Sequence, residues 1–304
     1  MSTEAVAARP AGDSTTTPTD GTVRLSGVAL VLGSCVSLQF GAAMAMSLFP
    51  VVGSWGTTAV RLAIASLVLL VLVRPRVRHW RRTEWVAVVA FGLTFAGMNG
   101  FFYAAIDRLP LGVTVSIQFL GPLALAAALS RRLRELGWVG LALAGMALFL
   151  VADLTGHSVL DPLGVALALA AGAFWALYIL ASHRVGALVP GTGGLAVALA
   201  VGALVLLPFG ARAFPTVALD PRLLAIAVGT AVLASVVPYT LELAALRRLP
   251  RPVFGVLLSL EPVVAVVAGL VLLGQGVSLL VVCAVLLVVA ASAGSTLSAR
   301  ARAA

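Results

Sequence analysis

The chain has 304 residues, of which 61% are apolar and 10% are charged, and its mean hydropathy is +1.12. Soluble domains carry about 25% charged residues, and so few polar side chains could not cover a core of this size in water. The composition therefore excludes a water-soluble enzyme and indicates a protein embedded in a lipid bilayer.

The charge is strongly basic, with 20 arginines, no lysine and a net charge of +9. In a soluble protein this balance would suggest nucleic-acid binding. The arginines lie between apolar runs, however, so we interpret them as determinants of membrane topology and expect no nucleic-acid partner. Because no H-E-x-x-H or C-x-x-C spacing occurs, we expect neither a metal nor a cofactor.

Residues 1–24 are rich in Thr, Ala, Pro and Gly without apolar periodicity, which predicts a disordered tail. Apolar runs long enough to span a bilayer follow in close succession. They predict ten transmembrane helices at approximately 26–49, 52–73, 85–106, 111–130, 136–152, 162–182, 192–211, 223–245, 253–273 and 277–298. Residues 299–304 form the expected C-terminal tail.

The arginines are distributed unequally between the two sides of this bundle. Sixteen fall on the tails and loops of one side, three (Arg108, Arg212 and Arg222) fall on the other, and Arg61 lies inside a helix. Short loops with positive charge stay in the cytoplasm. We therefore expect a multi-pass protein of the inner or plasma membrane with both termini in the cytoplasm.

An internal repeat divides the chain. The stretch RLPLGVTVSIQFLGP at 108–122 recurs 140 residues later as RLPRPVFGVLLSLEP at 248–262, and GVAL occurs at 27–30 and at 164–167. Residues 25–153 and 161–298 then hold five helices each, and because five is odd the second half must enter the membrane upside down. The predicted fold class is an all-α integral membrane protein of ten helices in two inverted five-helix repeats, an arrangement typical of secondary transporters.

Two ionisable residues are predicted near the middle of the bilayer. Arg61 lies nine residues beyond Val52 and Glu261 eight beyond Val253, which at 1.5 Å per residue places each roughly 12 to 14 Å deep in a core about 30 Å thick. We expect them to line a central cavity in which Arg61 binds the carboxylate and Glu261 the ammonium of a zwitterion. The alternative is that the two form one buried ion pair, or bond carbonyls and polar neighbours, and only lock the bundle.

Other polar side chains within the predicted spans are candidates for proton transfer or substrate binding. Glu242, near the cytoplasmic end of its span, is either a proton carrier or an acid at the membrane interface. The remaining candidate substrate-binding residues each also fit a role in helix contacts; they are Gln39, Asn99, Gln118, Tyr239 and Trp175.

Three prolines, Pro122, Pro238 and Pro262, fall inside apolar runs. A missing N–H there either leaves a carbonyl free to face a cavity or simply kinks the helix.

These features resemble the drug/metabolite transporter superfamily and its EamA domains. The stretches that carry the resemblance are SLFPVVG (47–53), TTAVRLAIASLVLL (57–70), GMNGFFYAAI (97–106), PLGVTVSIQFLGPLA (110–124), VPYTLELAALRRLP (237–250) and FGVLLSLEP (254–262). Within the superfamily they are similar to the inner-membrane exporters of threonine and homoserine.

The resemblance implies functional roles for Gln39, Arg61, Asn99, Glu242 and Glu261. Two positions depart from it. Gln118 stands where those exporters have an acid, and Gln275 stands where EamA repeats commonly end in L-G-E. Proton coupling, if present, must then fall on Glu261 or Glu242.

The sequence as a whole predicts a secondary active transporter, not an enzyme, that exports small amino acids such as threonine or homoserine by proton antiport. No nucleotide-binding motif is present to energise it otherwise. The expected partners are a small-molecule substrate and the lipid bilayer, and the sequence does not define an oligomeric state. The alternatives are efflux of another metabolite or a drug by the same fold, and a channel or passive membrane protein.

Overall fold

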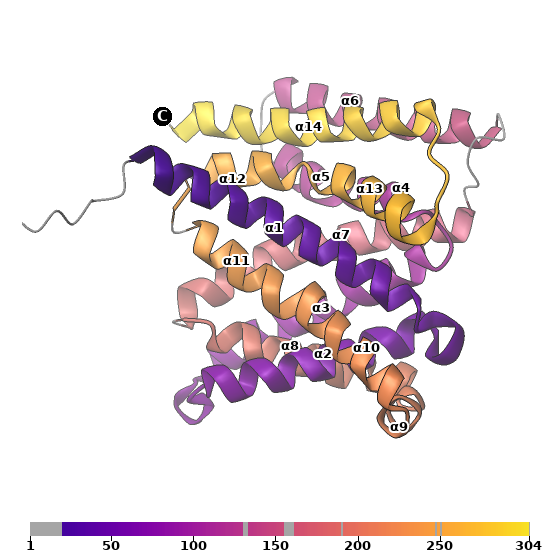
Figure 1. Ribbon diagram of the computed structural model, residues 1–304. Coiled ribbons are helices and arrows are strands. Elements are labelled where there is room, and N and C mark those ends of the chain that lie inside the picture. The colour runs from indigo at the N-terminus through magenta and orange to yellow at the C-terminus, as the bar shows by residue number, and fades with distance from the viewer. Residues whose placement is uncertain are drawn as a thin grey trace, which may run out of the picture.

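A computed structural model describes residues 20–129, 133–154, 161–189, 191–246, 248–249 and 251–303. Within these ranges every regular element is a helix (Figure 1). The elements are α1 (Asp20–Met46), α2 (Phe49–Val73), η1 (Val77–His79), α3 (Arg82–Ile106), α4 (Leu111–Gln118), α5 (Leu120–Leu129), α6 (Leu133–Leu154), α7 (Pro162–Leu188), α8 (Gly193–Gly210), α9 (Ala213–Leu219), α10 (Pro221–Ala231), η2 (Val232–Val236), α11 (Val237–Leu246), α12 (Arg251–Leu258), α13 (Glu261–Leu273) and α14 (Leu279–Ala303).

The described residues contain nine helical segments long and apolar enough to cross a membrane, and a tenth apolar helix, Leu136–Ala152, is shorter. These segments coincide with the ten predicted runs, with ends that differ by a few residues. Large apolar side chains are also exposed along the outside of the bundle, including Leu72, Leu204 and Leu279. The prediction of an all-helical membrane protein is confirmed.

Helices extend into both of the segments that the sequence predicts as tails. Helix α1 already begins at Asp20, and residues 1–19 lie outside the described part of the chain. At the other end α14 continues to Ala303, five residues beyond the predicted end of the last span. Alanine and arginine, which alternate after Ser298, both favour helix, so nothing in this sequence stops the helix at the membrane surface.

Two of the spans are broken at corresponding points of the internal repeat. The fourth span consists of α4 and α5, which meet at Phe119, and the ninth consists of α12 and α13, which meet at Ser259 and Leu260. In both spans the second helix begins just before or at a G-P or E-P pair, with Pro122 and Pro262 in its first turn. A proline in the first turn of a helix needs no N–H partner there, whereas further inside it would break a hydrogen bond.

The helices pack pairwise through the bundle. Helix α2 contacts α8, α6 contacts α14 and α4 contacts α13, while α1 packs against α11 and α3 against α7. Figure 1 shows α6 and α14 together along one side of the bundle, and α2 and α8 along the opposite side. It also shows the start of α1 and the end of α14 at the same end of the bundle.

The backbones of α5 and α7 approach each other at two glycines. A Cβ on Gly121 would lie 1.9 Å from the Gly172 carbonyl oxygen, and one on Gly172 would lie 2.7 Å from the Gln118 carbonyl oxygen. Only hydrogen fits at either position, so these glycines hold the broken fourth span against α7. The contact fixes the end of α4, where Gln118 lies.

We expect Gly121→Ala to destabilise the protein by about 1 to 3 kcal/mol, because the added methyl group meets backbone that cannot rotate away. The measurement is the midpoint of thermal unfolding in detergent. Gly140→Ala is the matched control, because a Cβ there meets nothing within 4 Å. Equal midpoints for the two variants would contradict the close packing of α5 on α7.

Candidate functional site

Arg61 is buried in the middle of α2, with only 2% of its surface exposed. Its Nη2 donates to the Asn99 Oδ1 of α3, and its Nη1 donates to the Ala234 carbonyl of η2 at 3.3 Å. The guanidinium carbon also lies 4.6 Å from the centre of the Tyr103 ring, within the range of a cation–π contact. Within the described part of the chain the Nε of Arg61 has no hydrogen-bond partner, so this N–H of the guanidinium is free.

Asn99 is oriented by its own helix. Its Nδ2 donates to the Phe95 carbonyl one turn earlier at 2.9 Å. Because the amide nitrogen donates to the helix backbone, the amide oxygen points away from that carbonyl. This oxygen accepts from Arg61. The acceptor for the guanidinium is therefore fixed before any ligand arrives.

Glu261 begins α13 at the break in the ninth span. A helix N-terminus favours a carboxylate, and the Nε2 of Gln39 in α1 donates to Glu261 Oε1 at 3.0 Å. Gln39 is 1% exposed, and no residue that the structure describes donates to its Oε1. A carboxylate and a free amide oxygen thus lie on neighbouring side chains, and both are acceptors suited to an ammonium group.

Glu242 of α11 is held in a similar way from α1. The Ser34 hydroxyl donates to Glu242 Oε1 at 2.8 Å, and it also lies 3.4 Å from the Pro238 carbonyl oxygen. Glu242 and Glu261 therefore both accept from neutral side chains of α1, five residues apart along that helix.

Arg61 and Glu261 do not pair. No ion pair joins them in the described part of the chain, since the hydrogen bonds of Arg61 go to Asn99 and Ala234 while that of Glu261 comes from Gln39. The sequence left open whether the two residues form an ion pair or bond to carbonyls and polar neighbours. The described residues show the second arrangement. The two charged groups keep separate sets of partners, as separate recognition of the two ends of a zwitterion requires.

The remaining candidates divide between two places. The Tyr239 ring lies 5.9 Å from Phe95, whose carbonyl holds Asn99, so Tyr239 is on the Arg61 side. The ring of Trp175 in α7 packs edge-on against that of Phe119, with 4.7 Å between the ring centres. Phe119 follows Gln118 at the break between α4 and α5. The structure does not bring Gln118 and Trp175 into contact with Arg61.

Tyr103 was not among the predicted site residues. It is 1% exposed, its ring lies under Arg61, and its hydroxyl has no hydrogen-bond partner in the described ranges. The sequence held a signal for it, because residues four apart share a helix face and Tyr103 follows Asn99 by four. Two further buried hydroxyls without a partner, on Thr230 and Ser235, lie in the eighth span.

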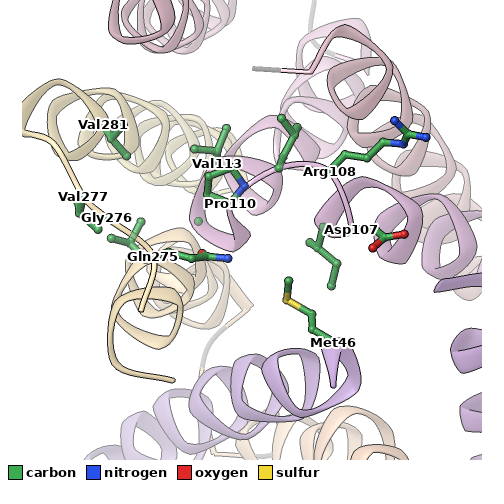
Figure 2. A pocket seen from close by; sticks show the side chains of 13 residues that line it. Met46, Asp107, Arg108, Pro110, Val113, Gln275, Gly276, Val277 and Val281 are labelled. Atoms are coloured by element: carbon green, nitrogen blue, oxygen red, sulfur yellow. The ribbon is translucent and has the colours of Figure 1, made fainter. Parts of the chain in front are cut away.

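A pocket of about 420 Å³ opens at the end of the bundle that carries Arg108 (Figure 2). Met46 and Gln275 point into it from opposite walls. The Gln275 Oε1 accepts from the Leu111 N–H at 3.0 Å, so this glutamine ties the loop after α13 to the start of α4. Ile106 also lines the pocket, and it belongs to the same apolar cluster as Tyr103.

An ion pair closes the rim of this region. Arg108 Nη1 lies 2.8 Å from Asp161 Oδ2, and the hydrogen bond from Arg108 lowers the pKa of the Asp161 carboxyl. Asp161 also accepts from the Leu163 N–H at the start of α7. The loop between α3 and α4 is thereby attached to the beginning of the second half.

Comparison with known proteins assigns the family. The model of the EamA-like transporter family matches residues 162–297. The threonine/homoserine exporter RhtA of Salmonella typhimurium (strain LT2) is 40% identical over 276 residues, which cover 90% of this chain and 92% of the relative. RhtA of Escherichia coli (strain K12) is 38% identical over 273 residues, with the same coverage of both chains.

A solved crystal structure has the same fold. It superposes with a TM-score of 0.60 over 92% of this chain and 100% of the solved chain, at 21% sequence identity. At this identity the likeness supports the helical architecture alone.

We expect Arg61→Ala to abolish transport while leaving the protein expressed, because it removes the only charge of the Arg61 and Asn99 pair. Arg61→Lys keeps the charge but loses the planar fork, and we expect it to raise the half-saturating substrate concentration about tenfold. The measurement is uptake of substrate into proteoliposomes. Arg212→Ala, at an exposed arginine between α8 and α9, is the control. Normal transport by Arg61→Lys would show that bidentate binding of a carboxylate is not the role of Arg61.

Proposed function

The chain belongs to the EamA-like transporter family, and we propose that within this family it exports threonine, homoserine or a similar small amino acid from the cytoplasm in exchange for protons. The protein is a multi-pass membrane transporter and not an enzyme. The observation that carries the substrate proposal is the presence of two unlike charges, Arg61 and Glu261, on apolar spans, where each has its own neutral partners.

Recognition of a zwitterion needs donors at one end and acceptors at the other. Arg61 offers an Nε that has no partner among the described residues, and its guanidinium lies over the ring of Tyr103, whose hydroxyl likewise has none; such donors suit a carboxylate. Glu261 and the free Oε1 of Gln39 suit an ammonium. The curated relatives are named as exporters of threonine and homoserine, both zwitterions with a side-chain hydroxyl.

Proton coupling is assigned to Glu261, with Glu242 as the second candidate. In the described residues neither carboxyl has a basic side chain as its partner; each accepts from an amide or hydroxyl of α1. A neutral donor can remain hydrogen-bonded whether the carboxyl is ionised or protonated, because a protonated carboxyl keeps an acceptor oxygen. A proton can then bind to the carboxyl and leave it again without the breaking of an ion pair.

Alternating access is assigned to two inverted five-helix halves, residues 25–153 and 161–298, with both termini in the cytoplasm. The broken spans support this assignment, because α4 and α12 begin and end 140 residues apart, as the sequence repeat does. The helix contacts support it too. In the repeat α7 is the counterpart of α1, and α11 is the counterpart of α3. The contact of α1 with α11 therefore has its equivalent in the contact of α7 with α3, and both are present. Rocking of such halves about a central site is the usual transport cycle of this architecture.

Efflux of another metabolite or an apolar drug is the second candidate. The observation in its favour is an aromatic wall near Arg61, where Phe95 lies 5.7 Å from Tyr178 and 5.9 Å from Tyr239 between ring centres. Such a wall binds apolar compounds without needing either charge.

The substrate class is tested by efflux from overexpressing cells loaded with labelled amino acids or common drugs. We expect saturable efflux of threonine and homoserine that is lost in Arg61→Ala, since the carboxylate then has no cation. Efflux of drugs alone, unchanged in Arg61→Ala, would instead support the aromatic wall as the site. Flux in proteoliposomes that does not saturate would indicate a channel.

We expect Glu261→Gln to eliminate the dependence of efflux on the pH gradient while counterflow exchange of substrate continues. Glutamine keeps the shape and the hydrogen bond to Gln39 but carries no exchangeable charge. The measurement is proteoliposome flux with and without an imposed pH gradient, with Glu242→Gln measured in parallel. Full pH-driven efflux by Glu261→Gln would transfer the coupling role to Glu242.

A further inference from the structure

The eighth span contains a π-helical turn, η2, between α10 and α11. In such a turn an N–H donates to the carbonyl five residues earlier instead of four, and the Val237 N–H accordingly donates to the Val232 carbonyl. The Leu233 carbonyl, which Val237 would serve in an α-helix, is left for another donor. The Ser37 hydroxyl of α1 donates to it at 2.8 Å.

Pro238 leaves a second carbonyl of this turn without its helical donor. Residue 238 lies in α11, where the α-helical pattern resumes. In this pattern it would donate to the Ala234 carbonyl four residues earlier, but proline has no N–H. The donor to this carbonyl is Arg61 of α2, whose Nη1 lies 3.3 Å away. One of the two hydrogen-bond acceptors of Arg61 is therefore available because residue 238 is a proline.

The turn is confined from the other side by α1. A Cβ on Gly41 would lie 2.7 Å from both the backbone nitrogen and the Cβ of Ala234, so the two backbones are in close contact. The π-helical turn cannot move toward α1, and its Ala234 carbonyl stays directed at α2. The acceptor and the guanidinium are thus held in register by packing as well as by the hydrogen bond.

We propose that Pro238 is a positioning residue for Arg61, and that the Ala234 carbonyl it exposes is exchanged for the carboxylate of the substrate during transport. The proposal rests on the assigned role of Arg61 in substrate binding. A carboxylate is a stronger partner for a guanidinium than a neutral carbonyl, so an arriving substrate displaces the carbonyl. When the substrate leaves, the carbonyl takes its place as the acceptor of Nη1, so this donor is not left unsatisfied.

This exchange predicts an unusual kinetic signature for Pro238→Ala. The alanine N–H can donate to the Ala234 carbonyl and compete with Arg61 for it. In the empty site the Nη1 of Arg61 then has a weaker acceptor while Nη2 keeps Asn99, so the site holds the substrate more tightly and releases it more slowly. We expect the half-saturating concentration and the maximal rate both to fall about tenfold, the effect of losing one hydrogen bond to a charged group.

Counterflow of radiolabelled threonine into proteoliposomes measures both constants. Ser37→Ala is a second variant on an independent bond: without the hydroxyl, the Leu233 carbonyl favours the Val237 N–H, and closing the turn into α-helix moves the Ala234 carbonyl away from Arg61. We expect the same direction of change, smaller in size. Pro208→Ala is the matched control, because Pro208 lies on the exposed side of α8 and no described side chain donates to the Leu204 carbonyl four residues before it.

A purely structural role for Pro238 would lower the rate without lowering the half-saturating concentration, and that result would overturn the inference. An equal effect of Pro208→Ala would also overturn it. If Pro238→Ala does not fold, Ser37→Ala decides by the same two constants. Wild-type transport by Arg61→Ala would instead contradict the proposed substrate site itself, so the two failures are distinguishable.

Discussion

The structure depends on satisfying one guanidinium in the interior of a membrane bundle. A charged side chain at such depth is costly, and its donors must find acceptors within the protein. Arg61 of α2 finds them on two other spans, at Asn99 of α3 and at the Ala234 carbonyl of the eighth span. Asn99 is in turn fixed by the Phe95 carbonyl, and the Ala234 carbonyl is free because Pro238 cannot serve it. Three spans are therefore oriented around a single side chain.

The acids of the candidate site are connected through a different element, α1. This helix donates from Ser34 to Glu242 and from Gln39 to Glu261. It belongs to the first half of the sequence, whereas both acids belong to the second. A change of charge or ligand at either acid therefore acts on a helix of the other half of the sequence.

The repeat shows how one scaffold acquires two roles. Gly121 and Glu261 occupy the same position of the repeated motif, 140 residues apart, at the start of the second helix of a broken span. In the first half the position lacks a side chain, which allows the backbone to pack against Gly172. In the second half it carries a carboxylate that reaches Gln39. The break is kept in both halves, and only the second half places a carboxylate at this position.

The sequence by itself determined the membrane class, the positions of the spans and the placement of Arg61 and Glu261 within two of these spans, because apolar run length is a local property. It also marked the broken spans through Pro122 and Pro262. It could not decide the partners of the two charged residues, since these depend on how each helix is rotated against its neighbours. The π-helical turn, the unpaired Tyr103 hydroxyl and the separation of Arg61 from Glu261 were decided by the tertiary structure alone, because each depends on donors or acceptors supplied by other spans.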